Sequence, residues 1–349
     1  MEMALYEPGL GYYASDRGVI GKSGDYYTSP HLHFAFGSVT GRQIEEMWHI
    51  MGAPSVFHII EIGAGAGYLC KDILDSLKGR DIFKSIRYVI VERSPLARKR
   101  HEKLLAGYAD TTKWVSSPEE VGRVSGCILS NELLDSFPVH IVEMEDDLKE
   151  VYVQVNGEDF VEVKDSPVSD AIAAYLEEFS VKLSWGYRTE INLRIKDWLA
   201  SVDKILQEGF IVTIDYGYPA VEYYSEDRNR GTLLCYHRHQ VHENPYSNIG
   251  DQDLTAHVNF SSVKKWGEDL GIKTIGFCRQ GLFLIALGID RIINDLGQDS
   301  KEYLFEVQKI KGLILPGTMG DTHKVLIQYK GSGAPELKGF SVRNQAGRL

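Results

Sequence analysis

Short apolar runs rich in valine and isoleucine recur along the chain, separated by amphipathic segments of helical period. Continuous apolar runs of this length are typical of strands buried on both faces of a sheet. Because strands alternate with helices, we expect an α/β fold with a doubly wound, mostly parallel sheet covered by helices on both faces. The seven predicted strands are Val56–Glu61, Tyr88–Glu92, Trp114–Val115, Gly126–Ser130, Phe210–Asp215, Ile272–Phe277 and Lys324–Tyr329.

Local signals mark several of the helices. Ser94 and Pro95 supply an N-cap and a first-turn proline for a helix over Leu96–Ala106. Before the first strand, Phe34–Ile50 has the pattern of an amphipathic helix, and the turn-rich segment Gly18–Pro30 precedes it. Residues 1–50 are therefore predicted to form an N-terminal lid segment followed by a helix.

The alternation of strands and helices is interrupted twice within residues 51–349, which we take as one domain. Between the fourth and fifth strands, residues 138–206 show strand-like alternation and then helical patterns, as expected of a large α+β insertion. Residues 218–259 are polar, aromatic and rich in histidine, with little periodicity. Because long insertions in compact domains usually carry function, we expect these two to form a substrate-binding subdomain.

Composition narrows the class of protein further. With 349 residues, 43% of them hydrophobic and 25% charged, the chain is neither disordered nor collagenous. No apolar stretch reaches ~18 residues, so we expect no membrane insertion. The 38 basic and 49 acidic residues give a net charge of −11 without a basic block, and nucleic acid is not an expected partner.

The cysteines and the N-terminus suggest where the protein works. The four cysteines lie far apart in the sequence, which favours neither a disulfide framework nor a zinc site, and we expect no metal. The N-terminus has no basic segment leading into an apolar run. We therefore expect a soluble cytosolic protein.

The first predicted strand runs into a turn of small residues that ends at Gly67. Such a turn lets a ligand reach main-chain amides, although it could also be only a tight strand–helix connection. The dinucleotide fingerprint requires glycine where Tyr68 stands, so E-x-G-x-G-x-G fits S-adenosylmethionine better. Glu92, which ends the second strand, can accept hydrogen bonds from both ribose hydroxyls, unless it is simply solvated. The predicted cofactor residues here are Glu61, Gly63, Ala64, Gly65, Gly67 and Glu92.

Polar side chains also gather where the fourth strand ends, at an edge where open α/β sheets bind ligands. Asn131 is predicted to hold the polar end of the cofactor. Glu132 and Asp135, three residues apart on an expected helical turn, are predicted to hold a cationic acceptor as the catalytic pair. Carboxylates can align a guanidinium by bidentate hydrogen bonding. The alternative is that Glu132 caps a helix and Asp135 is solvated.

Five further residues are candidates for contacts with the substrate or for a lid. Tyr26, Tyr27 and Thr28 could cover the cofactor, or the segment could pack only for stability. Asp215 ends the fifth strand at the same sheet edge and is either a third carboxylate near the acceptor or a turn residue. His257 is either a substrate contact or a packed histidine.

Seven segments of the sequence occur together in one known family. They are Ala4-Leu5-Tyr6 through Gly11-Tyr12-Tyr13, Gly24 to Pro30, Glu61 to Gly67, Ser130 to Val139, Ile214 to Gly217, Gly231-Thr232-Leu233 and Gln252 to Val258. Together they resemble the MidA-like family of S-adenosylmethionine-dependent methyltransferases, whose mitochondrial members are assembly factors for respiratory complex I. The resemblance spans nearly the whole chain.

This resemblance implies a Rossmann-like class I methyltransferase fold and methylation of arginine on a protein substrate, such as a subunit of respiratory complex I. Two other functions remain open from the sequence. The protein could be a non-catalytic assembly chaperone that keeps a cofactor pocket, or an O- or N-methyltransferase of small molecules. The long insertions favour a folded partner over a small molecule.

Overall fold

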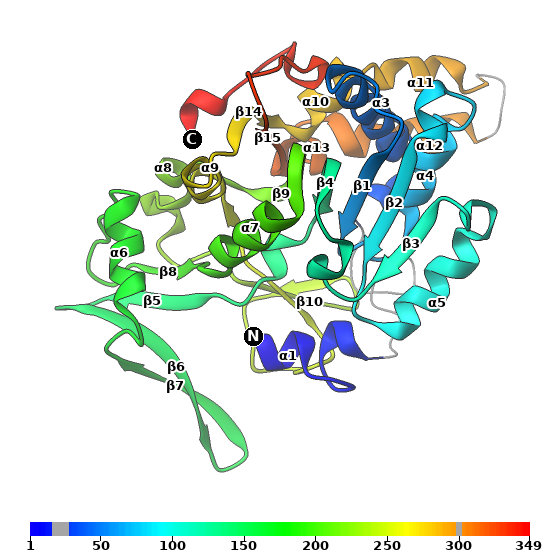
Figure 1. The fold of residues 1–349 in the computed structure, drawn as a ribbon. Helices are drawn as coiled ribbons and strands as arrows, with labels where there is room; N and C mark the ends of the chain where they lie inside the picture. The colour runs from blue at the N-terminus through cyan, green and yellow to red at the C-terminus, as the bar shows by residue number, and fades with distance from the viewer. Residues whose placement is uncertain (16–27, 298–301) are drawn as a thin grey trace.

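The structure is a computed structural model that describes the chain except for residues 16–27 and 298–301. Its central sheet has the strand order β14-β15-β9-β4-β1-β2-β3, and the short strand β13 (Val258–Asn259) pairs with β9 as an eighth member (Figure 1). Each of the seven predicted strands overlaps one strand of this path. Their bounds are β1 Phe57–Ile62, β2 Ile86–Val91, β3 Thr112–Val115, β4 Val124–Asn131, β9 Leu206–Tyr218, β14 Lys273–Arg279 and β15 His323–Lys330.

The sheet is mainly parallel, which confirms the predicted α/β class. The pairs β1·β2, β2·β3, β1·β4 and β4·β9 are parallel, whereas β15 is antiparallel to both β9 and β14. β15 lies between β9 and β14 and runs antiparallel to both. Its first residue, His323, is therefore paired with Tyr216 of β9. The carboxyl edge of the parallel strands therefore also receives the amino end of β15.

Helices cover both faces of the sheet (Figure 1). Side chains of β1 alternate between the two cores: Phe57 and Ile59 belong to one, and Ile60 and Ile62 to the other. The first core includes buried residues of α3, α4, α10 and α12, and the second includes those of α7 and α9. These helices are α3 Ala35–Ile50, α4 Tyr68–Leu77, α7 Arg194–Ile205, α9 Phe260–Asp269, α10 Gln280–Ala286 and α12 Tyr303–Ile314.

Helix ends follow local chemistry. Ser94 caps α5 (Pro95–Leu104), since its hydroxyl accepts a hydrogen bond from the Ala97 amide at 3.3 Å.

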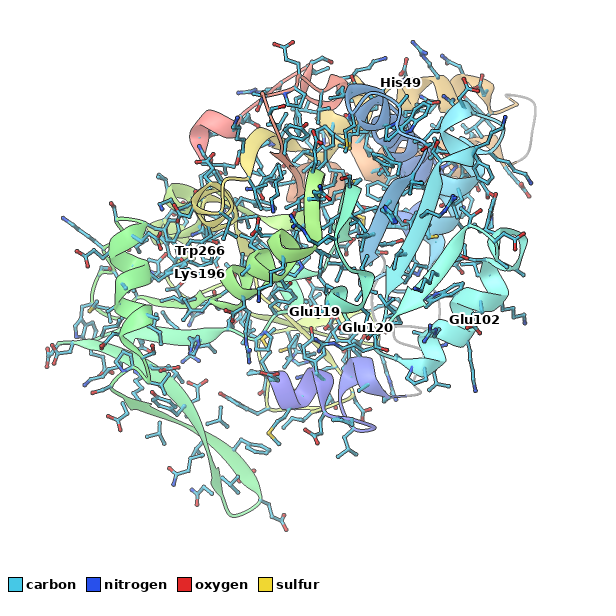
Figure 2. The ribbon with its side chains drawn as sticks, in the orientation of Figure 1. His49, Glu102, Glu119, Glu120, Lys196 and Trp266 are labelled. Carbon is cyan, nitrogen blue, oxygen red and sulfur yellow. The ribbon has the colours of Figure 1, made fainter. Side chains whose placement is uncertain are left out.

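Helices α7 and α9 also contact each other: the Lys196 ammonium of α7 lies 5.8 Å from the ring centroid of Trp266 on α9 (Figure 2). The remaining α-helices are α1 Glu2–Tyr6, α2 Ser29–Leu32, α6 Asp170–Glu178, α8 Ala220–Tyr223, α11 Ile289–Asp295 and α13 Met319–Thr322. In the part of the chain that the structure describes, no helix is long and apolar enough to span a bilayer.

Between β4 and β9 the chain forms a second, antiparallel sheet in the order β7-β6-β5-β8. The β6–β7 hairpin projects away from the body of the molecule (Figure 1). Its outer residues are largely exposed, including Val155 at 66% and Phe160 at 43%. The strand bounds are β5 His140–Met144, β6 Leu148–Asn156, β7 Asp159–Asp165 and β8 Arg188–Ile191.

Residues 218–259, which showed little periodicity, contain a small antiparallel sheet that the sequence did not predict. Its order is β11-β10-β12, and a buried cluster of Leu5, Tyr12, Cys235 and Leu254 joins it to the N-terminal segment. Strands of three or four residues are too short to show a clear alternation, which explains the missed prediction. The strands are β10 Leu234–His237, β11 Gln240–His242 and β12 Asp253–Thr255.

Candidate active site

The turn between β1 and α4 has a backbone that only glycine adopts readily. Gly63, Gly65 and Gly67 have φ angles of 74°, 56° and 81°, all in the left-handed region. The amide of Gly67 donates to the Ala64 carbonyl at 2.8 Å, which closes the turn just before the helix begins at Tyr68. The glycines predicted from the sequence thus shape a compact loop whose main chain is accessible.

Side chains from other elements press against this turn. A Cβ atom on Gly63 would lie 2.9 Å from Cδ1 of Leu133, and one on Gly67 would lie 3.0 Å from Cδ2 of His101. His101 is fully buried, and its Nε2 lies 2.8 Å from the Gly65 carbonyl oxygen. Sequence reasoning missed His101, because only the packing of α5 brings it to the turn.

The turn opens into a cavity that segments distant in sequence line together. Five of the predicted cofactor residues line it, whereas Gly67 and Glu92 are not among the lining residues. Helix α2, at the end of the predicted lid, also contributes to the wall. The lining residues are Thr28, Pro30, His31, Glu61, Gly63, Ala64, Gly65, Ala66, Tyr68, Leu69, Asn131 and Glu132.

Glu61 is fully enclosed beside this cavity. The Tyr88 hydroxyl donates to Oε2 of Glu61 at 2.6 Å, and this contact links β1 to β2. Burial raises the pKa of Glu61 to about 7, an effect that the Tyr88 hydrogen bond opposes. The carboxyl group therefore changes its charge near neutral pH, next to the cofactor turn.

Glu92 and Asn131 have polar atoms left for a ligand. Glu92 follows β2, and its Oε1 accepts a hydrogen bond from the Ser94 amide at 2.7 Å. The Asn131 amide nitrogen donates to Glu132 at 3.1 Å, while its Oδ1 is buried without a partner among the described residues. A buried acceptor without a partner suits a donor such as the amino group of S-adenosylmethionine. These residues therefore fit the predicted cofactor.

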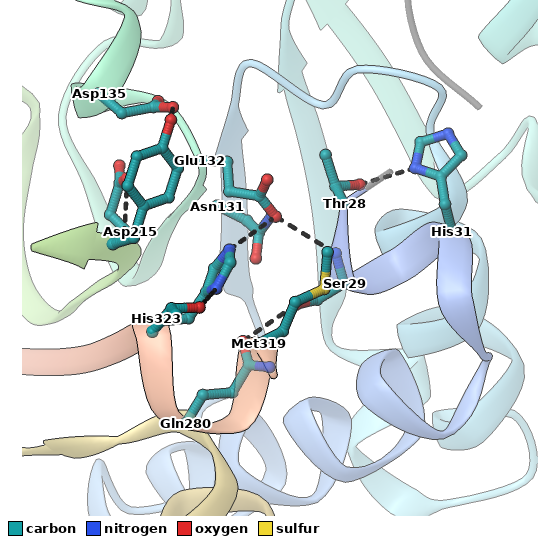
Figure 3. A network of polar contacts seen from close by, with 12 residues as sticks. Thr28, Ser29, His31, Asn131, Glu132, Asp135, Asp215, Gln280, Met319 and His323 are labelled. Carbon is teal, nitrogen blue, oxygen red and sulfur yellow. Dashed lines mark hydrogen bonds and ion pairs between the residues drawn. The ribbon is translucent and has the colours of Figure 1, made fainter. Parts of the chain in front are cut away.

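Glu132 is held by two hydrogen bonds and one ion-pair contact, from three elements (Figure 3). Its Oε1 accepts from the Ser29 amide at 3.2 Å and from Asn131 at 3.1 Å, and it lies 3.5 Å from Nε2 of His323. No hydrogen bond to its Oε2 occurs within the described residues, and the side chain lines the cavity. One carboxylate oxygen is thus fixed and the other is left for a ligand.

The expected helical turn carrying Glu132 and Asp135 was wrong. Glu132 has a φ of 50°, and the 3-10 helix η5 (Leu134–Ser136) begins only two residues later. Asp215 holds this turn, because its Oδ2 accepts hydrogen bonds from the amides of Leu133 and Leu134 at 3.1 and 2.9 Å. The carboxylate of Asp215 therefore supports the Glu132 backbone from the neighbouring strand β9.

Asp135 and Asp215 lie deep in the protein, at the carboxyl edge of the sheet. Burial, followed by repulsion from Asp215, raises the pKa of Asp135 well above its usual range, and burial raises that of Asp215 to about 7. The Tyr216 hydroxyl donates to Oδ2 of Asp135 (Figure 3), and Oδ1 is buried without a partner in the described part of the chain. Asp135 therefore favours the protonated state.

The remaining candidate residues lie in different places relative to the cavity. His257 packs near Tyr216 and Tyr218, with ring centroids 5.3 and 5.4 Å away, and burial lowers its pKa to about 4. The Thr28 hydroxyl lies 2.6 Å from Nδ1 of His31, a residue of the cavity wall that the sequence did not single out. The predicted lid residues Tyr26 and Tyr27 lie outside the described residues.

A glycine-cradled site at the carboxyl edge of a mainly parallel α/β sheet is the arrangement that nucleoside-binding folds use. Comparison with known proteins defines the class. Residues 39–278 match the model of a family of S-adenosyl-L-methionine-dependent methyltransferases. The chain belongs to this family, and the protein is an S-adenosylmethionine-dependent methyltransferase.

Relatives with names and solved structures agree with this class. The chain is 27% identical to "Protein arginine methyltransferase NDUFAF7 homolog, mitochondrial" of Drosophila melanogaster, over 98% of this chain and 83% of that protein. It is 26% identical to the NDUFAF7 protein of Homo sapiens, over 92% of this chain and 77% of that protein. A Burkholderia thailandensis structure bound to S-adenosyl-homocysteine has a TM-score of 0.92 and 29% identity, covering 100% of this chain and 90% of that one.

Proposed function

We propose that this protein transfers the methyl group of S-adenosylmethionine to an arginine side chain of a protein substrate. The observation that carries the proposal is Glu132, whose Oε1 is held by donors while its other oxygen is left for a ligand. A guanidinium offers N–H donors that suit such a carboxylate. The names of the relatives, which describe protein arginine methyltransferases, support the same substrate class.

The bound cofactor supplies an electrophilic methyl group on a sulfonium. The nitrogen of the acceptor must face that group with its lone pair available, because transfer forms an N–C bond as the S–C bond breaks. Glu132 accepts hydrogen bonds from the guanidinium and so orients the attacking nitrogen. The methylated guanidinium keeps one positive charge, so one proton leaves the acceptor, and Glu132 is positioned to accept it.

Asp135 acts as the second carboxyl group for the acceptor. A guanidinium near its unpartnered Oδ1 would favour the ionised form and offset the cost of burying the charge. The positive charge of the guanidinium would also offset the repulsion between Asp215 and Asp135. We therefore assign binding of the cation to Glu132 and Asp135 together, with Asp215 supporting the turn.

We further propose that the catalytic core is a seven-stranded class I unit and that residues 138–206 and 218–259 bind the protein substrate. The projecting β6–β7 hairpin and its exposed apolar side chains support this assignment. Residues 1–50 form the lid segment and its helix, a role supported by Thr28 and His31 in the cavity wall.

The cellular location is a separate proposal. The sequence favours the cytosol, whereas the names of the relatives place those proteins in mitochondria. The cytosol remains our proposal for this chain, and its four buried, unpaired cysteines fit a reducing compartment. Fractionation of the cells that make the protein tests this location.

The substrate class is tested by incubating the purified protein with labelled S-adenosylmethionine and a lysate of its own organism. Mass spectrometry of labelled peptides should show methylarginine. Glu132→Gln should lower kcat by about 100-fold or more, because it removes a charge that orients the acceptor. Its affinity for S-adenosyl-homocysteine should stay the same.

Glu102→Gln is the matched control, since Glu102 is exposed on α5 (Figure 2) and is not among the residues that line the cavity. It should retain the activity of the wild type. Label that appears only on lysine, or only on small molecules, would contradict arginine as the acceptor.

A further inference from the structure

His323 is a buried histidine beside the proposed catalytic carboxylate that neither the sequence nor the comparisons single out. It is the first residue of β15, and its Nε2 lies 3.5 Å from Oε1 of Glu132 (Figure 3). Both side chains are only 7% exposed. An interaction between two such enclosed polar groups is little screened by water.

The imidazole of His323 is held in one orientation from two other sides. Its Nδ1 lies 3.0 Å from the Thr322 hydroxyl, and its ring packs edge-on against Tyr216 with centroids 5.5 Å apart. When one ring nitrogen has a partner, the hydrogen bond made there determines which proton the other nitrogen carries. With Nδ1 engaged by Thr322, Nε2 faces Glu132 at 3.5 Å, an ion-pair distance, and it donates there when it carries a proton.

The charges around the ring favour a donor at this place. Glu132 and Asp215 supply negative charge, and His323 in turn opposes the rise in the pKa of Asp215. Tyr216, His257 and the adjacent Lys324 are further titratable groups near the ring, and burial keeps His257 neutral. Glu132 is therefore the carboxylate that Nε2 meets, at an ion-pair distance of 3.5 Å.

We propose that His323 is a positioning residue, whose Nε2 fixes the carboxylate of Glu132 so that Oε2 faces the acceptor nitrogen. This inference rests on the proposed function of Glu132. The two hydrogen bonds and the ion-pair contact come from α2, β4 and β15, so they constrain the carboxylate from different elements. Without His323, the Ser29 and Asn131 contacts leave the carboxylate free to turn.

The test compares His323→Leu with His323→Gln, since the glutamine amide can still donate to Glu132. In the leucine variant kcat should fall at least tenfold, while the affinity for S-adenosyl-homocysteine is unchanged. The glutamine variant should recover most of that loss. A purely structural role of His323 would not produce this recovery together with unchanged cofactor affinity. His49→Leu, at an exposed site on α3 (Figure 2), serves as the control and should have no effect.

Crystal structures of the same variants with S-adenosyl-homocysteine test the inference without measuring activity. The Glu132 carboxylate should be displaced in His323→Leu and retained in His323→Gln. A folded leucine variant with Glu132 unmoved would overturn the positioning role, and so would wild-type kcat in that variant. A wild type that methylates no arginine would instead refute the proposed function, while the position of Glu132 would still decide the role of His323.

Discussion

Single residues of the cofactor turn have little conformational choice. Gly65 has a φ of 56° in a loop that must bring its main chain close to the cofactor. The structure explains the pattern of glycines that the sequence showed, and it adds His101 as the side chain that holds the Gly65 carbonyl. A substitution here should therefore act on binding as well as on stability.

Gly65→Val is expected to abolish binding of S-adenosyl-homocysteine in calorimetry. A β-branched side chain at positive φ also costs about 1–3 kcal/mol of folding free energy. Gly52→Val is the matched control, because Gly52 has a φ of 81° and an added Cβ there meets no atom within 4 Å. The control should lose similar stability but keep its affinity. Equal affinities in both variants would refute the role of the turn.

Glu61 should make the stability of the protein depend on pH. Burial raises its pKa to about 7 in the folded state, so its contribution to stability is fully present below its unfolded pKa and is lost as pH rises through 7. Glu61→Gln keeps an acceptor for Tyr88 but cannot ionise. Between pH 5 and pH 8 the wild type should lose on the order of 3 kcal/mol of unfolding free energy through Glu61, and the variant should avoid this loss.

Urea unfolding at several pH values measures this effect. Asp72 and Asp215, whose pKa values are also raised to about 7 by burial, keep part of the pH dependence in both proteins. The stability difference between Glu61→Gln and the wild type should therefore grow in favour of the variant as pH rises. Parallel curves for the two proteins would show that Glu61 does not titrate in this range.

The sequence predicted which polar residues lie at the sheet edge better than it predicted what each of them does. Asn131, Glu132 and Asp215 do meet at one sheet edge, but both oxygens of Asp215 accept main-chain amide hydrogen bonds. Two of these donors, the amides of Leu133 and Leu134, lie more than 80 residues away in the chain, so no local pattern could indicate them. Asp215 supports the turn at Glu132 only because β9 packs beside β4 in the sheet.

At the level of elements, most core strands were predictable because they are buried runs with a clear apolar pattern. The exception is the short strand β3, of which only Trp114–Val115 was predicted. The small β10–β12 sheet was not predictable, since its strands are short and its order depends on contacts with the N-terminal segment. The β6–β7 hairpin is intermediate: its alternation was visible, but its projection from the body was not. An element with so many exposed residues contributes little to the core.

Shortening this hairpin should separate substrate binding from folding. Val153 and Glu162 are paired across the two strands, so residues 154–161 can be replaced by Asn-Gly, which favours a two-residue turn. We expect an unchanged melting temperature within a few degrees and unchanged affinity for S-adenosyl-homocysteine, because the removed residues are mostly exposed. Methylation of the protein substrate should fall strongly.

The measurement compares methylation of the identified protein with methylation of a short arginine peptide from it. The peptide should remain a substrate, since it reaches the site without docking on the hairpin. Full methylation of the intact protein by the shortened variant would exclude the hairpin from substrate binding.

At the scale of the whole molecule, the cofactor site joins the two cores to the lid segment. Its lining residues come from β1 and the turn after it, from α4, from β4 and from α2, and His323 of β15 lies 3.5 Å from Glu132. A ligand bound at this site contacts several elements, so it should stabilise the whole folded domain. At 100 times its Kd, S-adenosyl-homocysteine should add about 2.7 kcal/mol to the free energy of unfolding.

Thermal unfolding with increasing ligand measures this stabilisation. NAD at the same concentration is the control, because Tyr68 stands where a dinucleotide fingerprint requires glycine. A rise in melting temperature with NAD but none with S-adenosyl-homocysteine would contradict the assigned cofactor.

The amino-acid sequence by itself determined the α/β class, the glycine turn and the cofactor, because these depend on local periodicity and on backbone conformations that one residue type adopts. Only the tertiary structure decided that β15 runs antiparallel, that His101 supports the turn and that His323 meets Glu132. Those contacts join residues distant in the chain, and their geometry is set by how strands and helices pack. The chemistry of the site depends on both.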